Sequence, residues 1–181
     1  NGGDPAFKNY RGYPSTLCIS LNEVVVHGIP TTIEIKEGDI ISIDCGVKIN
    51  KYYGDYAYTF IVGDTTENRK KLVEVTFNSL QLGISKACTG NKTGDIGNII
   101  QNYVEKFGFS VVRELVGHGI GKSLHDKPEV PNYGSRGKGE LLTENMVICI
   151  EPMINLGKKE VYQLDDGWTI KTKDHQASAH F

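Results

Sequence analysis

The sequence lacks the features that mark proteins bound to nucleic acid or to membranes. Its 181 residues carry a formal net charge of −2, so there is no excess of basic residues for a phosphate backbone or an anionic lipid surface. Its apolar runs fall well short of the roughly 18 residues that span a bilayer. These absences predict a protein with neither a nucleic-acid nor a membrane partner.

Closely spaced cysteine pairs are also absent. Cys18, Cys45, Cys88 and Cys149 are far apart in the sequence, and no two of them form a CxxC motif. Scattered cysteines favour reduced thiols, which are typical of a cytoplasmic protein. With 39% hydrophobic residues the chain is expected to be globular, and its length suits one domain.

The spacing of apolar residues predicts the regular elements. A strand is expected over 17–27 and a β-hairpin over 37–62. The region 109–181 is expected to form strands joined by glycine-rich loops.

Two helices are expected between these β regions. Thr65-Thr66-Glu67 is typical of a helix start, and the spacing of later apolar residues predicts an amphipathic helix over 67–87. A second helix is expected over 93–107, with Gly108 as its stop. The residues expected to face inward are Val73, Phe77, Leu80 and Ile84 in the first helix and Ile96, Ile100, Tyr103 and Phe107 in the second.

Two acidic residues, Asp44 and Asp55, lie in the predicted hairpin. A turn centred between Ile49 and Asn50 would place them directly opposite each other. Opposed side chains on one face of a sheet have Cβ atoms about 4.5–5.5 Å apart, and like charges there are destabilising. The pair therefore predicts either a cation between the two carboxylates or a proton on one of them.

A faint internal repeat accompanies this pair. The stretch 37–44 resembles 144–151, and each is expected to be an apolar strand that ends in an acid, Asp44 and Glu151 respectively. Each half also carries a His-Gly-Ile turn, at His27 and at His118. The recurrence of both patterns in the same order favours a fold of two similar halves.

Carboxylates together with histidines and few thiols describe a site for hard or borderline divalent metals. His118 lies between two glycines, so the backbone can approach other segments closely and aim the imidazole. Glu151 follows the apolar run 146–150, where an unpaired charge would be costly. Taken singly, each residue is explained by a turn, a cap or a loop; the combination favours a metal site.

The residues named so far belong to longer motifs. These are the segment 10–30, Ile43-Asp44, Gly54-Asp55, Gly117–Gly121 followed by His125, Ile150–Met153 and Trp168–Asp174. In order and spacing, over nearly the whole chain, they resemble the type I methionine aminopeptidases. The resemblance implies an α+β pita-bread fold: a curved antiparallel sheet with helices on its outer face and pseudo-two-fold related halves. It also implies that residues 1–181 form a single metallopeptidase catalytic domain. That domain lacks the usual N-terminal helix and the final strand, and the family's last glutamate ligand would follow Phe181.

The resemblance further implies removal of the initiator methionine from nascent proteins with a small second residue. The enzyme would be a cytoplasmic monomer acting at nascent polypeptide N-termini, near the ribosome. It would use two divalent metal ions, Co, Mn, Fe or Zn. Asp44 would hold one ion with both oxygens, Asp55 would bridge the two, and His118 and Glu151 would bind the other.

Catalytic and substrate-binding roles are implied in the same way. Glu151 is the implied general base, and His27 and His125 would stabilise the tetrahedral intermediate and hold the peptide. The positions that form the methionine pocket in relatives are here Phe7, Tyr10, Tyr13, Cys18, His27, Leu124, His125 and Trp168.

Two alternatives remain open at this point. One is a peptidase of the same fold that acts before proline, which the segment 20–30 and the short interval from His118 to His125 disfavour. The other is a catalytically impaired pita-bread protein or fragment that only binds partners. Retention of the acids disfavours that reading, because a binding module gains nothing from uncompensated carboxylates.

Overall fold

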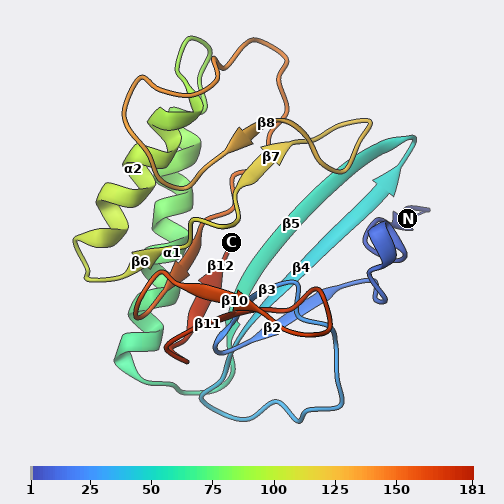
Figure 1. The fold of residues 1–181 in the computed structure, drawn as a ribbon, viewed down its shortest axis with the longest axis vertical. Coiled ribbons are helices and arrows are strands. Elements are labelled where there is room, and N and C mark those ends of the chain that lie inside the picture. Colours follow the sequence, from blue (N-terminus) through green and yellow to red (C-terminus); the bar gives the residue numbers. More distant parts are fainter. Residues whose placement is uncertain (1) are drawn as a thin grey trace.

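A computed structural model describes residues 2–181, in which helices lie on one flank and a long β-hairpin on the other (Figure 1). The hairpin consists of β4 (Ile40–Ile49) and β5 (Tyr52–Ile61), which pair along their whole length. Asn50 and Lys51 form its turn with φ values of 51° and 70°. Two consecutive residues with positive φ are typical of a two-residue hairpin turn whose twist matches the strands. The predicted hairpin is therefore confirmed.

The predicted register of the hairpin is wrong. Asp44 pairs with Ala57, and Asp55 pairs with Gly46, so the two acids are diagonal neighbours rather than directly opposed. The shift follows from the turn, which is centred between Asn50 and Lys51, one residue later than expected. Because Asp55 and Ala57 lie two residues apart, both acids still project from one face of the hairpin.

Further short strands extend this sheet and build a second one. β1 (Asp4–Pro5) and β2 (Cys18–Leu21) pair with the edge of β4 that β5 leaves free. The single strand expected over 17–27 is divided, because Asn22 adopts a φ of 51° and turns the chain. The part after the turn, β3 (Val24–Val26), joins a separate sheet in the order β10-β11-β3, with β10 at Val161–Gln163 and β11 at Ile170–Thr172.

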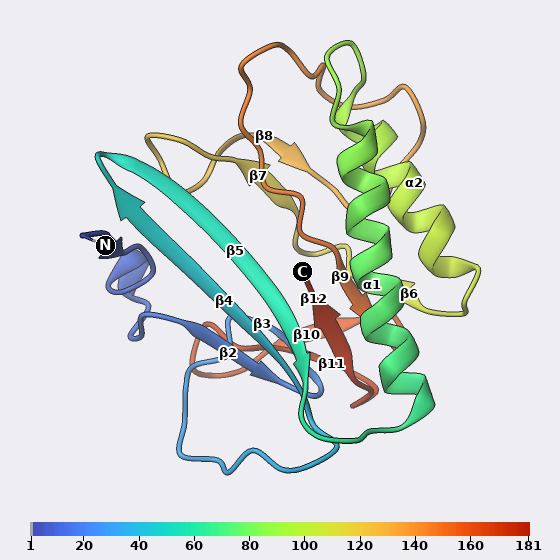
Figure 2. The same cartoon turned by 180° about the vertical axis from the view of Figure 1, so that it is seen from behind.

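The remaining strands lie nearer the helices. The order β12-β9-β6 joins Ser178–His180, Met153–Asn155 and Ser110–Val111. β7 (Gly117–Gly119) pairs with β8 (Asp126–Val130). Between β1 and β2 a short 3-10 helix, η1, covers Tyr10–Gly12. Seen from behind, β12 ends between the hairpin and the helices (Figure 2).

Both helices form close to their predicted bounds. α1 covers Glu67–Lys86 and α2 covers Thr93–Glu105. The hydroxyl of Thr66 accepts a hydrogen bond from the backbone N–H of Arg69 at 3.4 Å, as expected for a helix cap. Within residues 2–181, no helix is long and apolar enough to cross a membrane.

The inward face expected for α1 is partly wrong. Phe77 and Ile84 stay 41% and 49% exposed, whereas Leu72 and Val75 are fully buried. Gly83 contributes to this orientation. A Cβ at this position would lie 2.8 Å from Cδ1 of Ile100, so the absence of a side chain lets α2 approach this face of α1 closely. In α2, Ile96 and Ile100 are buried as expected, but Phe107 lies beyond the helix and is 40% exposed.

The largest core cluster fills the space between the helices and the sheets. Its members include Ile40, Leu72, Val75, Ile96, Ile100, Val104, Val130 and Ile154. A separate cluster joins the N-terminal segment to the loop before β8 through Phe7, Tyr13, Cys18 and Leu124. The site described next lies against this second cluster.

The two stretches that resemble each other in sequence, 37–44 and 144–151, differ in local structure. Asp44 lies within β4, not at its end. The corresponding stretch 144–151 is largely irregular, with a single isolated bridge from Ile148 to Gly119. The expected second strand ending in an acid is therefore wrong: the stretch lies beside β7 through two backbone hydrogen bonds, Ile120 N–H to Val147 and Cys149 N–H to His118, and forms no regular strand before Glu151.

Candidate metal centre

The hairpin supplies two carboxyl groups to the interior of the site. Burial and the neighbouring Asp55 raise the pKa of the Asp44 carboxyl far above its ordinary range. Burial and the charge of Glu151 raise the pKa of the Asp55 carboxyl as well. Buried acids with raised pKa values show that this site is unfavourable for negative charge when no cation is present.

His118 reaches the same place from β7, and its flanking glycines explain how. A Cβ on Gly117 would lie 2.3 Å from the carbonyl oxygen of Cys149, and a Cβ on Gly119 would lie 2.1 Å from that of Lys127. Side chains at either position would push these segments apart. The expected close backbone approach around His118 is thus confirmed, and the side chain of His118 is only 11% exposed.

One hydrogen bond sets the proton on the His118 ring. Nδ1 lies 2.9 Å from the backbone oxygen of Gly119, and since a carbonyl oxygen can only accept, Nδ1 carries the proton. In the neutral ring, Nε2 then presents its lone pair. It faces Oε1 of Glu151 at 3.2 Å and Oδ2 of Asp55 at 3.8 Å. A nitrogen lone pair directed at two carboxylates is the arrangement of a metal ligand.

Glu151 lies just before β9 and is held by its backbone. Its carbonyl oxygen accepts a hydrogen bond of 2.9 Å from Nδ2 of the fully buried Asn132. Its side-chain Oε1 is buried and has no hydrogen-bond partner among residues 2–181. The preceding apolar run is less buried than expected, since Val147 is 62% exposed. The orphaned carboxylate oxygen is what a bound cation would satisfy.

The four residues that the sequence predicts as ligands, Asp44, Asp55, His118 and Glu151, line one cavity. Within residues 2–181, the only side chains that form charge pairs with Asp55 or Glu151 are histidines. No lysine or arginine there balances the carboxylates. Hard oxygen donors with one imidazole suit a divalent cation, so the residues fit the metal expected from the sequence.

Cys149 also lies at this cluster. Its sulfur, an oxygen of Asp55 and a nitrogen of His118 all lie within 4.8 Å of one another. Burial and the charge of Glu151 raise the pKa of the Cys149 thiol to about 12, so the thiol stays protonated near neutral pH. Hard and borderline divalent cations prefer carboxylate oxygen and imidazole donors to a thiol, which favours the carboxylates over Cys149.

His180 is a site residue that sequence reasoning missed. It is 3% exposed, its Nε2 has no hydrogen-bond partner among the described residues, and that atom lies 3.7 Å from Oε2 of Glu151. The hydroxyl of Thr59 bonds both the backbone N–H and the backbone oxygen of His180, at 2.9 and 2.7 Å. The signal in the sequence was a histidine within an otherwise small and apolar strand.

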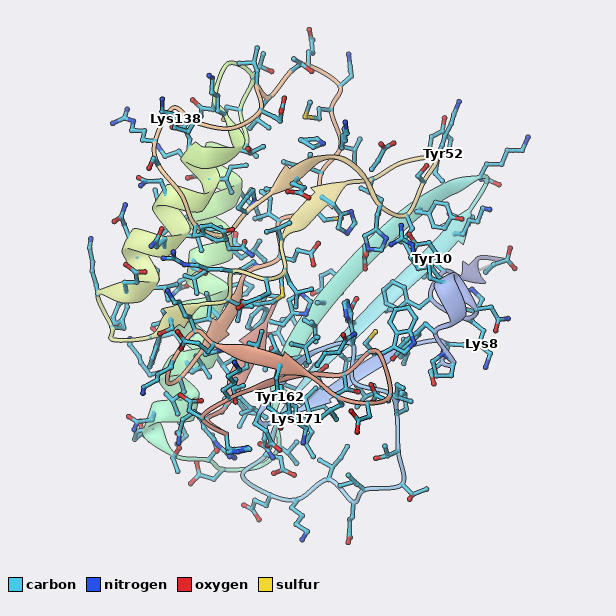
Figure 3. All side chains as sticks on the ribbon, viewed as in Figure 1. Lys8, Tyr10, Tyr52, Lys138, Tyr162 and Lys171 are labelled. Carbon is cyan, nitrogen blue, oxygen red and sulfur yellow. The ribbon has the colours of Figure 1, made fainter. Side chains whose placement is uncertain are left out.

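A cavity of about 190 Å³ opens from the metal ligands toward the N-terminal segment. It is lined by Phe7, Tyr10, Arg11, Tyr13, Cys18, His27, Asp44, Asp55, His118, His125, Glu151 and Trp168. Of the expected pocket residues only Leu124 is not on this surface; it is 3% exposed and packs behind the wall. Arg11 is a lining residue that the sequence did not indicate. Figure 3 shows Tyr10 beside the hairpin, on the side of the N-terminal segment.

Local packing fixes the walls of this cavity. A Cβ on Gly46 would lie 2.4 Å from Cε1 of Phe7, so the Phe7 ring rests directly on β4. Tyr13 and Trp168 make an edge-to-face contact with ring centroids 5.2 Å apart. Burial and the nearby Asp44 raise the pKa of the Cys18 thiol to about 12, which keeps this wall uncharged.

Two of the three histidines that line the cavity, His27 and His125, are neutral near pH 7. Burial lowers the pKa of His27. Burial and then the charge of His118 lower the pKa of His125 to about 4. Each ring therefore carries one N–H that can donate to an oxygen atom of a bound ligand.

Comparisons with known proteins agree with this geometry. A sequence model of metallopeptidase family M24 matches residues 2–175. The methionine aminopeptidase of Clostridium perfringens is 51% identical over 181 residues, which are 100% of this chain and 73% of that protein.

Solved structures are similar along the same length. The crystal structure of methionine aminopeptidase from Rickettsia prowazekii matches with a TM-score of 0.97 and 45% identity, covering 99% of this chain and 73% of that one. The prolidase from Pyrococcus horikoshii matches with a TM-score of 0.67 and 25% identity, covering 91% and 46%. The expected α+β pita-bread fold is confirmed by the first of these matches.

Proposed function

This chain belongs to metallopeptidase family M24, and we propose that Asp44, Asp55, His118 and Glu151 bind the divalent metal with which it removes N-terminal methionine. The chain is a metal-dependent aminopeptidase of the methionine aminopeptidase type, as the high identity along its whole length supports. One observation carries the assignment of the site. The lone pair of His118 and the unpartnered Oε1 of Glu151 face each other at 3.2 Å, with Asp55 beside them, and no lysine or arginine of the described residues 2–181 pairs with these carboxylates.

The positions of the four residues support the ligand roles that we propose. Asp44 and Asp55 lie on one face of the hairpin, so Asp44 would hold one ion with both oxygens, while Asp55, nearer His118, would bridge two ions. His118 and Glu151 would complete the coordination of the second ion. Such ions make a water molecule acidic enough to ionise near neutral pH and polarise the carbonyl that it attacks. The number of ions, two, and their identity among Co, Mn, Fe and Zn are part of the proposal.

The protein's own residues supply the remaining chemistry. Glu151 accepts the proton of the attacking water, since its carboxylate borders both the ligands and the cavity. His27 and His125, both neutral, donate hydrogen bonds to the carbonyl oxygen as it gains negative charge. His125 lies close to the ligands, with its ring centroid 4.2 Å from that of His118.

The apolar end of the cavity binds the methionine side chain. Phe7, Tyr13 and Trp168 form its walls, Cys18 adds an uncharged thiol, and Leu124 supports the wall from behind. A flexible thioether packs well against aromatic rings. Tyr10 and His125 lie at the polar side of this cavity, where the peptide backbone would pass.

The substrates proposed here are the N-termini of nascent proteins with a small second residue. We place the enzyme in the cytoplasm as a monomer that meets its substrates near the ribosome. The described chain would be the single catalytic domain of that enzyme. An Xaa-Pro peptidase is disfavoured by the weaker likeness to prolidase. An inactive binding module is disfavoured by the presence of Asp44, Asp55, His118 and Glu151 around one cavity.

A direct assay tests this function. The full-length protein supplied with Mn, Co or Fe should release free methionine from Met-Ala-Ser. A peptide with a bulky second residue, Met-Leu-Ser, should be cleaved much more slowly. Faster cleavage of an Xaa-Pro peptide would contradict the substrate assignment, and no release with any of these ions would overturn the function.

A further inference from the structure

Tyr10 and His125 are joined by a hydrogen bond at the polar side of the cavity. The hydroxyl of Tyr10 lies 2.9 Å from Nδ1 of His125, and the two ring centroids are 5.2 Å apart. Tyr10 comes from η1 and His125 from the loop before β8, so the contact joins segments that are far apart in the sequence. A tyrosine that served only as an apolar wall would have no need of this bond.

The backbone around Tyr10 is held in an uncommon conformation. Asn9 and Arg11, the residues on either side, have φ values of 65° and 49°. Left-handed conformations of residues other than glycine carry strain and are kept where surrounding structure fixes them, often at functional sites. The guanidinium of Arg11 also lies 5.4 Å from the centre of the Tyr10 ring. These features fix the position from which the hydroxyl meets His125.

The contact is compatible with two proton positions, because a phenol hydroxyl can donate to Nδ1 of His125 or accept from it. A neutral imidazole carries its single proton on one nitrogen and accepts at the other. When the phenolic O–H donates to Nδ1, the ring proton is placed on Nε2, which points away from Tyr10. Among residues 2–181 no group hydrogen-bonds to that Nε2, so it is free to donate to a ligand in the cavity.

We propose that Tyr10 is a positioning residue that fixes the ring and the Nε2–H tautomer of His125, so that Nε2–H donates to the substrate's carbonyl oxygen. The inference rests on the proposed function, because it assigns this donor to the peptide that the enzyme cleaves. It gives the Tyr10 hydroxyl a task separate from the contact that its ring makes with the methionine side chain.

A double-mutant cycle on the full-length, metal-loaded enzyme tests the positioning role. Tyr10→Phe keeps the ring and removes the hydroxyl. We expect kcat for Met-Ala-Ser to fall roughly 5- to 30-fold, the effect of one hydrogen bond lost in the transition state, with KM changed less than about two-fold. In a His125→Ala background the same change should have almost no further effect. An equal loss in both backgrounds, or a rise in KM alone, would overturn the proposal.

A measurement on the metal-free protein tests the role of Tyr10 independently of the proposed peptidase activity. Nitrogen NMR of histidine-labelled protein should show Nδ1 of His125 as an unprotonated, hydrogen-bonded nitrogen whose resonance shifts in Tyr10→Phe. The matched control is Tyr133→Phe, which removes a hydroxyl that donates to the backbone oxygen of Arg113. This variant should leave the His125 resonance unchanged.

Two outcomes of this measurement would overturn the proposal. One is a proton on Nδ1 in the wild type; the other is a resonance that Tyr10→Phe does not move. A wild-type protein that releases no methionine would instead overturn the proposed function, while the spectrum would still decide whether Tyr10 fixes the His125 proton.

Discussion

Asp44 and Asp55 lie on two ten-residue strands that pair without a break, whereas His118 and Glu151 lie on short or irregular segments. The pairing of β7 with β8 shifts register directly after His118, and Glu151 lies outside any strand. The difference indicates two ways of holding a ligand. A continuous ladder resists the repulsion between paired acids, while the second half depends on individual hydrogen bonds.

Those individual bonds can be named. The backbone N–H of Cys149 donates to the oxygen of His118 at 2.7 Å, and Asn132 donates to the oxygen of Glu151 at 2.9 Å. Nδ1 of His118 donates to Gly119. Loss of one such bond should therefore disturb the second half of the site, while the hairpin should respond mainly to changes in its charges.

The largest effect is expected at Asp55, the hairpin carboxylate that lies beside His118 of the second half. Asp55→Asn should lower kcat/KM for Met-Ala-Ser by about three orders of magnitude, because an amide cannot bridge two cations as a carboxylate does. The check is steady-state kinetics together with the metal content of the purified variant. The exposed Asp165→Asn serves as the matched control and should leave both values unchanged. Unaltered rate and metal content in Asp55→Asn would refute the bridging role.

A smaller effect on metal binding is expected when the hydrogen bond that holds the backbone of Glu151 is removed. Asn132→Ala removes the bond to Glu151 and is expected to weaken metal binding roughly 10-fold, as loss of a residue that orients a ligand usually does. Asn98→Ala removes a similar bond of 3.0 Å to the oxygen of Gly134, away from the site, and should leave the affinity unchanged. Calorimetric titration with Mn would compare the two variants, and equal affinities would show that Glu151 is held without Asn132.

The repulsion in the hairpin should appear as a pH dependence of the metal-free protein. The folded state raises the pKa values of Asp44 and Asp55, so it binds protons more tightly than the unfolded chain. The free energy of unfolding should therefore fall as pH rises from about 4, the ordinary range of these acids, through neutral pH. Asp44→Asn should flatten this fall and raise the melting temperature at pH 8 by about 2–4 °C.

Thermal unfolding at several pH values, with and without metal, gives the comparison. Added metal should remove most of the pH dependence in the wild type, since the cation replaces the protons. Stability that instead increased with pH in the metal-free protein would mean that the two acids are not forced together.

The smallest effect is expected at Cys149. Because carboxylate oxygens and one imidazole suit a hard or borderline divalent ion better than a thiol does, Cys149→Ala should change metal affinity by less than about two-fold, as should the exposed control Cys88→Ala. A 10-fold or greater loss in Cys149→Ala alone would place the sulfur among the ligands.

Much of the site could be predicted because its residues lie in local patterns. The hairpin and both helices follow from apolar spacing, and the close approach around His118 follows from its two flanking glycines. The register could not be predicted, since it depended on Asn50 and Lys51 both adopting positive φ. The inward face of α1 was decided by Gly83 against Ile100, a tertiary contact.

His180 and Asn132 were missed for a related reason. His180 is placed by Thr59, 121 residues away in the sequence, and Asn132 meets Glu151 only in the folded chain. Apart from the place of His180 in a strand of small and apolar residues, nothing in the neighbouring sequence marks either residue as part of the site.

The most direct test of the account is anomalous diffraction from crystals of the full-length protein soaked in Mn. The account predicts anomalous density within bonding distance of Asp44 and Asp55 from the hairpin and of His118 and Glu151 from the second half. Density bound by Cys149 in place of Glu151, or no density between the two halves, would contradict it.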